Sequence, residues 1–222
     1  MGTKMIKFMA GAAVFLFTIT TNIQAQTVIS EEKLKELQKQ SFEKNHLRLS
    51  YKDIHSLYKK WEYNNMDSDF VLLLQIALQE SRLNPQAVSK SYAIGLTQIL
   101  RSTHKEIQHR ILKQPTWDQF NLFNPTYALL NTEIYLRWLW KNGKKKRRIK
   151  DIIAKKGGQF ALLMMYKEGI RGASMNWNTV QYKRGWKYAT EVQGKFTEAN
   201  DILEKSKHIY INHLMGKRVS VR

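Results

Sequence analysis

The stretch IALQESRLNPQAVSKSYAIGLTQIL, residues 76–100, contains the features that decide the fold. It continues an apolar segment, Phe70–Leu78, in which almost no polar face is left. A helix of this kind is buried on most of its sides. The pair Asn84-Pro85 stops the helix, because proline disfavours helical geometry in the residue before it. The sequence therefore predicts a buried helix that ends just after an acidic residue, Glu80.

The rest of the chain also reads as helical. Asp67-Ser68-Asp69 offers N-cap side chains for the helix that begins near Phe70. Only three prolines and eleven glycines interrupt 222 residues, and neither sustained polar–apolar alternation nor an internal repeat is visible. Residues 30–64 predict one or two leading amphipathic helices, and residues 196–216 predict a last one, closed by Gly216. These patterns predict an all-α domain.

The first 25 residues indicate export. Lys4 and Lys7 precede an apolar run that is shorter than the roughly 20 residues of a membrane span. Ile23-Gln24-Ala25 then resembles a signal-peptidase site, so we expect cleavage after Ala25 and a periplasmic protein. The alternative is an uncleaved N-terminal anchor. Because the chain contains no cysteine, neither disulfides nor a lipidated cysteine can hold it.

Charge points to the same compartment. The formal net charge is +19, which in a cytosolic protein would first suggest nucleic acid. Behind an export signal it indicates an anionic cell envelope instead, with no nucleic-acid partner and membrane contact only at an anionic surface. The run KNGKKKRRIK, residues 141–150, is predicted to be a loop between two helices. It is either simply solvated or attracted to wall carboxylates, anionic lipid or an assembly partner.

Glu80 is the candidate for chemistry. It follows Ile76 by four residues and so projects from the apolar stripe of its helix, in the last turn, where the helix dipole disfavours an anion. Burial and the dipole both raise the pKa of a carboxyl group, as a general acid working near neutral pH requires. The alternative is an ordinary exposed glutamate in a fraying turn.

Four motifs in order extend this interpretation. Glu80-Ser81 is followed by SKSYAIGLTQIL, residues 89–100, where small Ala93 and Gly95 permit close backbone approach. Together they resemble the Glu-Ser and Gly-Leu-x-Gln signature of the soluble lytic transglycosylase catalytic domain, which has a lysozyme-like fold. The further matches are Asn124-Pro125 with Tyr135-Leu136, then Ala161–Gly169, then Tyr188–Val192.

The resemblance implies a division of the chain and a substrate. A catalytic domain would span residues 55–195, after a helical leader, 26–54, and before a C-terminal helix and basic tail, 196–222. The last helix either packs on this domain or binds a partner. The substrate would be the glycan strands of peptidoglycan, cut by a monomer without a cofactor.

The resemblance also implies residue roles. Glu80 would be the single acid and base, and the substrate-binding set would be Ser81, Gly95, Leu96, Gln98, Tyr166 and Tyr188. Tyr166 would hydrogen-bond near the Glu80 carboxyl and orient it. Ser81 and Gln98 would contact substrate or hold the loop, and for Ser81 a bond back to a helix carbonyl is an equal alternative.

The chain departs from the family pattern at several positions. Lys167 replaces the asparagine of the Tyr-Asn pair, and Glu168 adds a carboxylate that we expect to be a solvated loop charge. The other departures are Thr97 for methionine, Arg101 for proline, and Ala128 and Thr132 for asparagine and glycine.

Other chemistry has little support in the sequence. The histidine pairs His104/His109 and His208/His213 are five residues apart, a poor spacing for shared metal ligation on a helix, and no Gly-rich phosphate loop is present. We therefore expect no metal. The aromatic residues of the second half are expected to be mostly core, with some lining a sugar groove: Tyr135, Trp138, Trp140, Trp177, Tyr182, Trp186 and Tyr188.

Two rival functions remain open. One is a lysozyme-like hydrolase in which Glu168 or Asp118 is a second acid. The other is a non-catalytic scaffold that binds the wall. By analogy with short exported enzymes of this kind, the chain would serve a secretion or conjugation assembly that needs a local gap in the wall.

Overall fold

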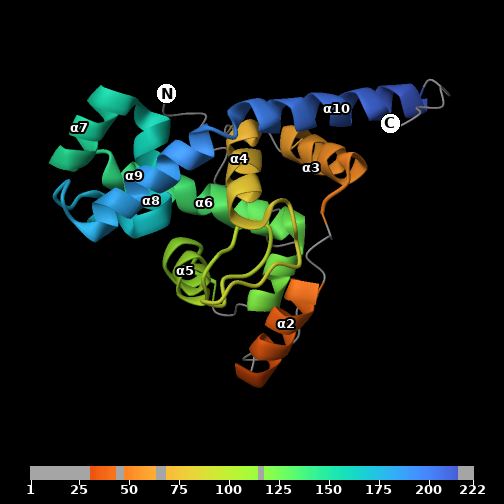
Figure 1. Ribbon diagram of the computed structural model, residues 1–222, viewed down its shortest axis with the longest axis horizontal. Coiled ribbons are helices and arrows are strands. Elements are labelled where there is room, and N and C mark those ends of the chain that lie inside the picture. Colours follow the sequence, from red (N-terminus) through yellow and green to blue (C-terminus); the bar gives the residue numbers. More distant parts are fainter. Residues whose placement is uncertain (1–30, 44–47, 64–68, 115–117, 215–222) are drawn as a thin grey trace.

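The computed structural model describes residues 31–43, 48–63, 69–114 and 118–214. Helices joined by loops make up this part of the chain, so the all-α prediction is confirmed, and its β pairing consists of two isolated bridges, Val88 with Ile94 and Ile94 with Ile99 (Figure 1). The predicted signal peptide, residues 1–25, lies outside the described residues, as does Gly216. The elements are α2 (Glu31–Glu43), α3 (Tyr51–Tyr63), α4 (Phe70–Ser81), α5 (Arg101–Lys105), the π-helix η1 (Glu106–Ile111), the 3₁₀ helix η2 (Gln119–Phe123), α6 (Pro125–Gly143), α7 (Arg147–Lys156), α8 (Gly158–Ala173), α9 (Val180–Gln193) and α10 (Phe196–Leu214).

Helix α4 is the predicted buried helix and lies at the centre of the molecule (Figure 1). Its start is capped as expected, since the Asp69 side chain accepts a hydrogen bond from the Val71 N–H. Its end comes at Ser81, three residues before Asn84-Pro85, because Arg82 and Leu83 take left-handed φ angles of 54° and 64°. This turn brings the next segment back across the end of the helix.

Helices from the second half of the chain pack around α4. Its buried side chains share one core with α6, α8 and α9, and the Gln75 Nε2 donates to the Val192 carbonyl oxygen of α9 at 3.1 Å. Because every side of α4 is covered, its position is fixed along most of its length. Its C-terminal turn, with Glu80, is where the helix reaches the surface.

The last helix packs onto the domain. Helix α10 lies along α3 and against the start of α4, with Leu203 buried and the Lys207 Nζ 5.0 Å from the centre of the Tyr58 ring (Figure 1). The sequence left open whether this helix packs or binds a partner, and the structure shows that it packs. Phe196, expected on its apolar face, is 52% exposed, because it precedes the part of the helix that meets the core at Ala199.

The expectation of a loop over residues 141–150 was wrong for most of the run. Helix α6 continues to Gly143 and helix α7 starts at Arg147, which leaves three residues between them. The cause is a helical apolar pair, Ile149 and Ile152, whose side chains are buried while the charged side chains around them face solvent. The prediction failed because the many charged residues of this run outweighed the two apolar positions that make α7 amphipathic.

The segment from Asn84 to Leu100 is a tight loop rather than a strand or helix. The Gly95 N–H donates to the Ala87 carbonyl oxygen at 2.8 Å, and Ile94 and Ile99 exchange two backbone hydrogen bonds of 3.1 and 3.2 Å. Gly95 has φ +79°, and a Cβ at this position would lie 2.0 Å from the Leu122 carbonyl oxygen. The close approach expected from the small residues is therefore present at Gly95.

This contact predicts the effect of adding one methyl group. Gly95→Ala should lower the free energy of unfolding in urea more than Gly157→Ala does, because Gly157 has a similar φ, +88°, but open space around its Cβ direction. A left-handed backbone alone costs about 1–3 kcal/mol for a residue other than glycine, so the excess loss at Gly95 measures the clash. Equal losses for the two variants would contradict the close approach.

Candidate functional site

Glu80 lies in a groove at the C-terminal end of α4. Its side chain is 14% exposed, and the groove, of about 920 Å³, is lined by the end of α4, the loop that follows it and the side of α2. The groove is open to solvent, so a polymer can enter it from the side. The structure thus places the predicted acid where a large substrate can reach it.

Burial controls the protonation of Glu80. Desolvation raises the pKa of its carboxyl group above the ordinary value, and the neighbouring Lys167 ammonium and Tyr188 hydroxyl oppose the shift without cancelling it. The direction agrees with the sequence expectation. The carboxyl is therefore protonated at higher pH than an exposed glutamate would be.

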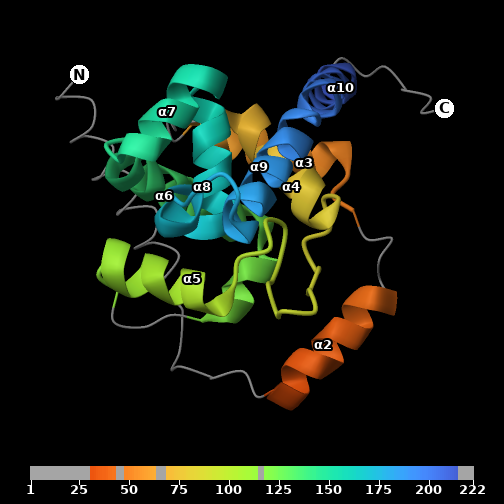
Figure 2. The ribbon, with the colours of Figure 1, turned by 60° about the vertical axis from the view of Figure 1, so that its left-hand side comes forward.

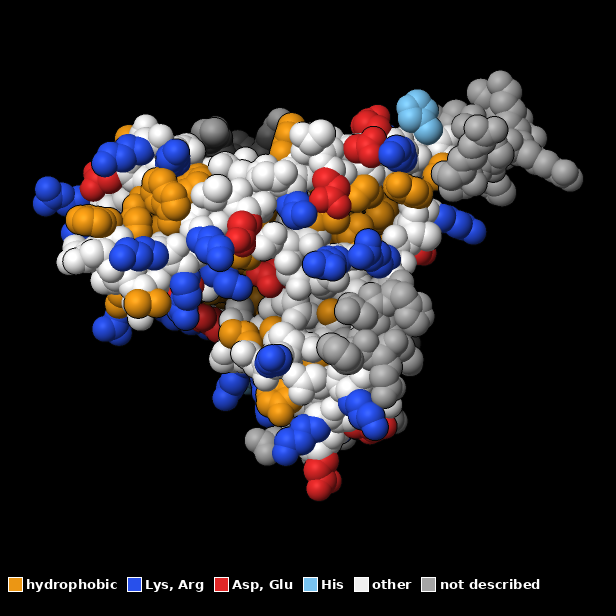
Figure 3. Space-filling view, viewed as in Figure 1, with side chains coloured by type: hydrophobic (Ala, Val, Ile, Leu, Met, Phe, Trp, Pro, Cys, Tyr) orange, Lys and Arg blue, Asp and Glu red, His pale blue; other side chains and the backbone are white. Residues whose placement is uncertain are grey.

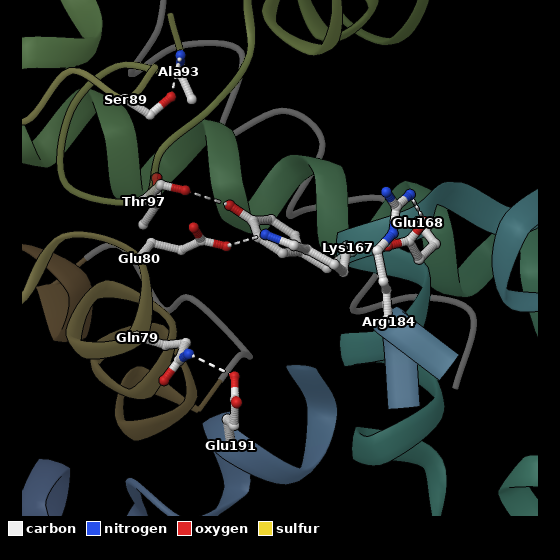
Figure 4. A network of polar contacts seen from close by, with 10 residues as sticks. Gln79, Glu80, Ser89, Ala93, Thr97, Lys167, Glu168, Arg184 and Glu191 are labelled. Atoms are coloured by element: carbon white, nitrogen blue, oxygen red, sulfur yellow. Dashed lines mark hydrogen bonds and ion pairs between the residues drawn. The ribbon is translucent and has the colours of Figure 1, made fainter. Parts of the chain in front are cut away.

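Lys167, on α8, lies beside Glu80. Its Nζ lies 3.7 Å from the Glu80 Oε1 (Figure 4). The same Nζ lies 4.9 Å from the centre of the Tyr188 ring. A cation here stabilises the carboxylate more than the acid, and the ring face holds the ammonium by a cation–π contact. The departure at Lys167 thus places a positive charge at the candidate catalytic acid.

Ser81 fastens the loop to the helix end. Its Oγ lies 3.2 Å from the Ala77 carbonyl oxygen and 2.7 Å from the Leu96 carbonyl oxygen. The one hydroxyl proton is thus shared between the back-bond that the sequence offered as an alternative and a shorter bond across to the loop. The Leu96 side chain is fully buried, so it packs in the core rather than facing the groove.

Gln98 ties the loop to itself. Its Nε2 donates to the carbonyl oxygens of Ala87 and Gly95, at 3.0 and 2.9 Å, and its backbone takes a left-handed φ of 51°. Of the two roles considered for Gln98, these bonds hold the loop. Its side chain also lines the groove, whereas Gly95 is buried below.

Tyr166, on α8, holds the same loop from the other side. Its hydroxyl donates to the Thr97 carbonyl oxygen at 2.8 Å, and the pKa of this hydroxyl is raised by burial and then by the nearby Glu80. The Thr97 hydroxyl lies 2.8 Å from the Thr132 hydroxyl of α6. Two departures from the family pattern, Thr97 and Thr132, are thus partners in one buried hydrogen bond.

Tyr188, on α9, lies behind Glu80. Its hydroxyl is buried, and no hydrogen bond of ordinary length joins it to another described residue, yet it is close enough to the Glu80 carboxyl to lower the pKa of that group. Its own pKa is raised, first by burial and then by the Glu80 charge. The ring stacks near that of Tyr166, with centres 6.3 Å apart. Both tyrosines are close to the acid, but neither is among the groove residues.

Glu168 differs from the expectation of a solvated loop charge. It belongs to α8, its side chain is 5% exposed, and both of its oxygens accept hydrogen bonds from Arg184 of α9, at 3.0 and 2.7 Å. Figure 4 shows it pointing away from Glu80, on the opposite side of Lys167. Asp118 is also engaged, because its carboxylate accepts the Phe120 N–H at the start of η2.

The groove contains basic residues that sequence reasoning missed. Arg82 and Lys90 come from the α4 end and its loop, and Lys35 and Lys39 come from α2. The lysines of α2 were visible in the sequence of the predicted helical leader, but no sequence pattern indicated that this helix lies in the same groove as Glu80. Of the aromatic residues expected in part to line a groove, Tyr135 and Tyr188 are buried and Trp177 is 71% exposed. None of the seven is among the groove residues.

The comparison with protein families agrees with this geometry. Residues 56–188 match the family model described as the transglycosylase SLT domain, which covers more than half of the chain. The match includes α4, the loop after it, α6, α8 and most of α9. No curated protein matches the chain.

The contact between Lys167 and Glu80 yields a pH prediction. Lys167→Gln should raise the pKa of the Glu80 carboxyl further, because desolvation then acts without the nearby cation. A carbon-13 NMR titration of the glutamate side chains measures it. The matched control is Lys183→Gln, which removes an exposed lysine of α9. A Glu80 pKa that falls or stays unchanged in Lys167→Gln would show that the pair has no electrostatic effect.

Proposed function

The chain belongs to the transglycosylase SLT family, and on that premise we propose that it is a lytic transglycosylase of peptidoglycan. It cuts the β-1,4 bond between N-acetylmuramic acid and N-acetylglucosamine without water and leaves 1,6-anhydro-muramic acid ends. The observation that carries the proposal is one partly buried carboxyl group of raised pKa, Glu80, in a groove open to a polymer.

The reaction needs two proton transfers at the same carboxyl group. Protonated Glu80 donates to the glycosidic oxygen as its bond to C1 breaks, and the N-acetyl group of the substrate stabilises the cation at C1. The Glu80 carboxylate then accepts the proton of the 6-hydroxyl group as O6 bonds to C1. The acid is regenerated and no second carboxylate is required, unlike in ordinary glycosidases.

Neighbouring residues position this carboxyl group. Lys167, 3.7 Å away, stabilises the carboxylate that exists between the two transfers. Ser81 and Gln98 keep the loop against the helix end, and Tyr166 fixes the same loop through the Thr97 carbonyl oxygen. In this proposal Tyr166 acts on Glu80 through the loop, which its hydroxyl holds at the Thr97 carbonyl oxygen, rather than by a direct hydrogen bond.

Two contacts favour transfer within the substrate over hydrolysis. The acids considered as a second catalytic group, Glu168 and Asp118, already accept hydrogen bonds from Arg184 and from the Phe120 N–H. A hydrolase that inverts needs a second free carboxylate to activate water, and one that retains can need it as nucleophile. A positively charged Lys167 beside Glu80 does not supply that function.

Substitution of Glu80 tests the proposal. Glu80→Gln keeps the size of the side chain but can neither donate nor accept the proton, so release of anhydro-muropeptides from purified peptidoglycan should fall by at least ~10²–10⁴-fold. Tyr166→Phe should lose less, because it removes one hydrogen bond to the loop. Mass spectrometry of the digest identifies the ends, since anhydro products are one water lighter.

The comparison variant is Glu168→Gln, which should still yield anhydro ends because Glu168 is bound to Arg184. Reducing muramic acid from the wild type would establish a hydrolase. Binding to peptidoglycan without any cleavage would identify a scaffold, and near-normal turnover by Glu80→Gln would place the chemistry on another residue.

We further propose that the protein works outside the cytoplasm, where its substrate lies. The support is the export signal of residues 1–25. Within the described ranges, no helix has the length and apolarity needed to cross a membrane. N-terminal sequencing of protein from the envelope fraction should begin at Gln26, and an intact Met1 on the mature protein would refute cleavage.

A further inference from the structure

The groove that holds Glu80 has a wall made by α2. Lys35, Gln38 and Lys39 of this helix line the groove opposite the end of α4. The Gln38 Nε2 donates to the Ser89 carbonyl oxygen at 2.9 Å, which joins the helix to the loop after α4. Figure 2 shows α2 apart from the other helices and beside this loop. The family match starts at residue 56, so this wall lies outside the matched region.

Cationic side chains outnumber carboxylates around the groove. The four cationic side chains that line it are Lys35, Lys39, Arg82 and Lys90, and Glu80 is its one carboxylate within the described residues. Each of the four cations is exposed, and none forms an ion pair with a described residue. Figure 3 shows the same excess of blue over red on the molecular surface.

The acidic residue of α2 that is nearest in sequence to these lysines does not neutralise them. Glu36 is held by Lys33 at 2.8 Å and by the Gln40 Nε2 at 2.9 Å, and it is absent from the groove lining. Among the described residues, Glu80 is therefore the one carboxyl group of the groove that can offset its four cations. Clefts lined by charges of one sign concentrate ligands of the opposite sign.

We propose that this basic wall binds the carboxylates of stem peptides, so that the enzyme selects glycan strands that still carry their peptides. The inference rests on the proposed function. A glycan backbone of acetylated amino sugars is neutral once the lactyl groups are amide-linked to peptide, so the anions available to the wall are the free carboxylates of the peptides. Exposed ion pairs are individually weak and are screened by salt. We therefore expect the groove cations to change the affinity for the strands modestly and in a salt-dependent way.

The test compares two substrates that differ only in charge. Soluble strands with stem peptides are used as isolated or after their carboxylates have been converted to neutral amides. The full-length protein and Lys35→Gln/Lys39→Gln are assayed for kcat and KM at low and high salt. The matched control, Lys150→Gln/Lys155→Gln, removes two exposed lysines from α7, which is distant from the groove.

The expected result is specific to the combination of variant and substrate. Lys35→Gln/Lys39→Gln should raise KM on native strands by about three- to tenfold at low salt, with kcat unchanged and with no effect on amidated strands. High salt should remove the difference. The α7 control should match the wild type on both substrates. An equal change on native and amidated strands, or no change on either, would overturn the proposal.

A binding measurement separates this proposal from the proposed function. Fluorescently labelled native and amidated strands are titrated into Glu80→Gln with and without the two α2 substitutions. If the wild type releases no anhydro product but the α2 substitutions weaken binding of native strands only, the wall is supported and the proposed reaction fails. If the wild type releases anhydro product but native and amidated strands bind equally in all variants, the proposed reaction is supported and the proposed role of the basic wall is refuted.

Discussion

The hydrogen bond from the Ser81 Oγ to the Leu96 carbonyl oxygen joins the two parts of the molecule on which the site depends. One part is α4, a helix enclosed by its neighbours, and the other is a loop with little regular structure. Alone, such a loop would sample many conformations. Fixed at Leu96, at Gln98 and through Tyr166, it becomes a rigid edge beside Glu80. The positions of the loop residues beside Glu80 are therefore fixed by their hydrogen bonds to helices of the packed core.

Two opposing effects meet at Glu80. Burial at the end of an apolar helix favours the neutral acid, whereas Lys167 favours the carboxylate, and burial prevails. An acid that must also act as a base benefits from both, since a carboxyl stabilised in only one state would be poor at either donating or accepting a proton. The motif that residues 161–169 resemble has an asparagine at the position of Lys167. This chain therefore has a more positive site than its family signature predicts.

The sequence predicted the parts that depend on local periodicity. The burial of α4, the position of Glu80 in its last turn and the last helix all follow from apolar spacing and capping residues. The contacts between distant residues could not be predicted this way, because Glu168 and Arg184, or Thr97 and Thr132, become neighbours only after the helices pack. The same applies to the α2 wall. In residues 141–150 the many charges hid the short apolar stripe of α7.

Helix α10 closes the domain in a way that affects how the chain folds. It covers α3 and the start of α4, so these two helices find part of their packing only at Ala199 and Leu203. During synthesis, α4, the most apolar of the described helices, therefore emerges long before α10, which covers its start. Contacts of such large sequence separation slow folding and prolong the exposure of apolar surface. The nascent chain cannot complete its core until its last helix has been made, and until then the start of α4 offers a binding site to a chaperone that binds apolar segments.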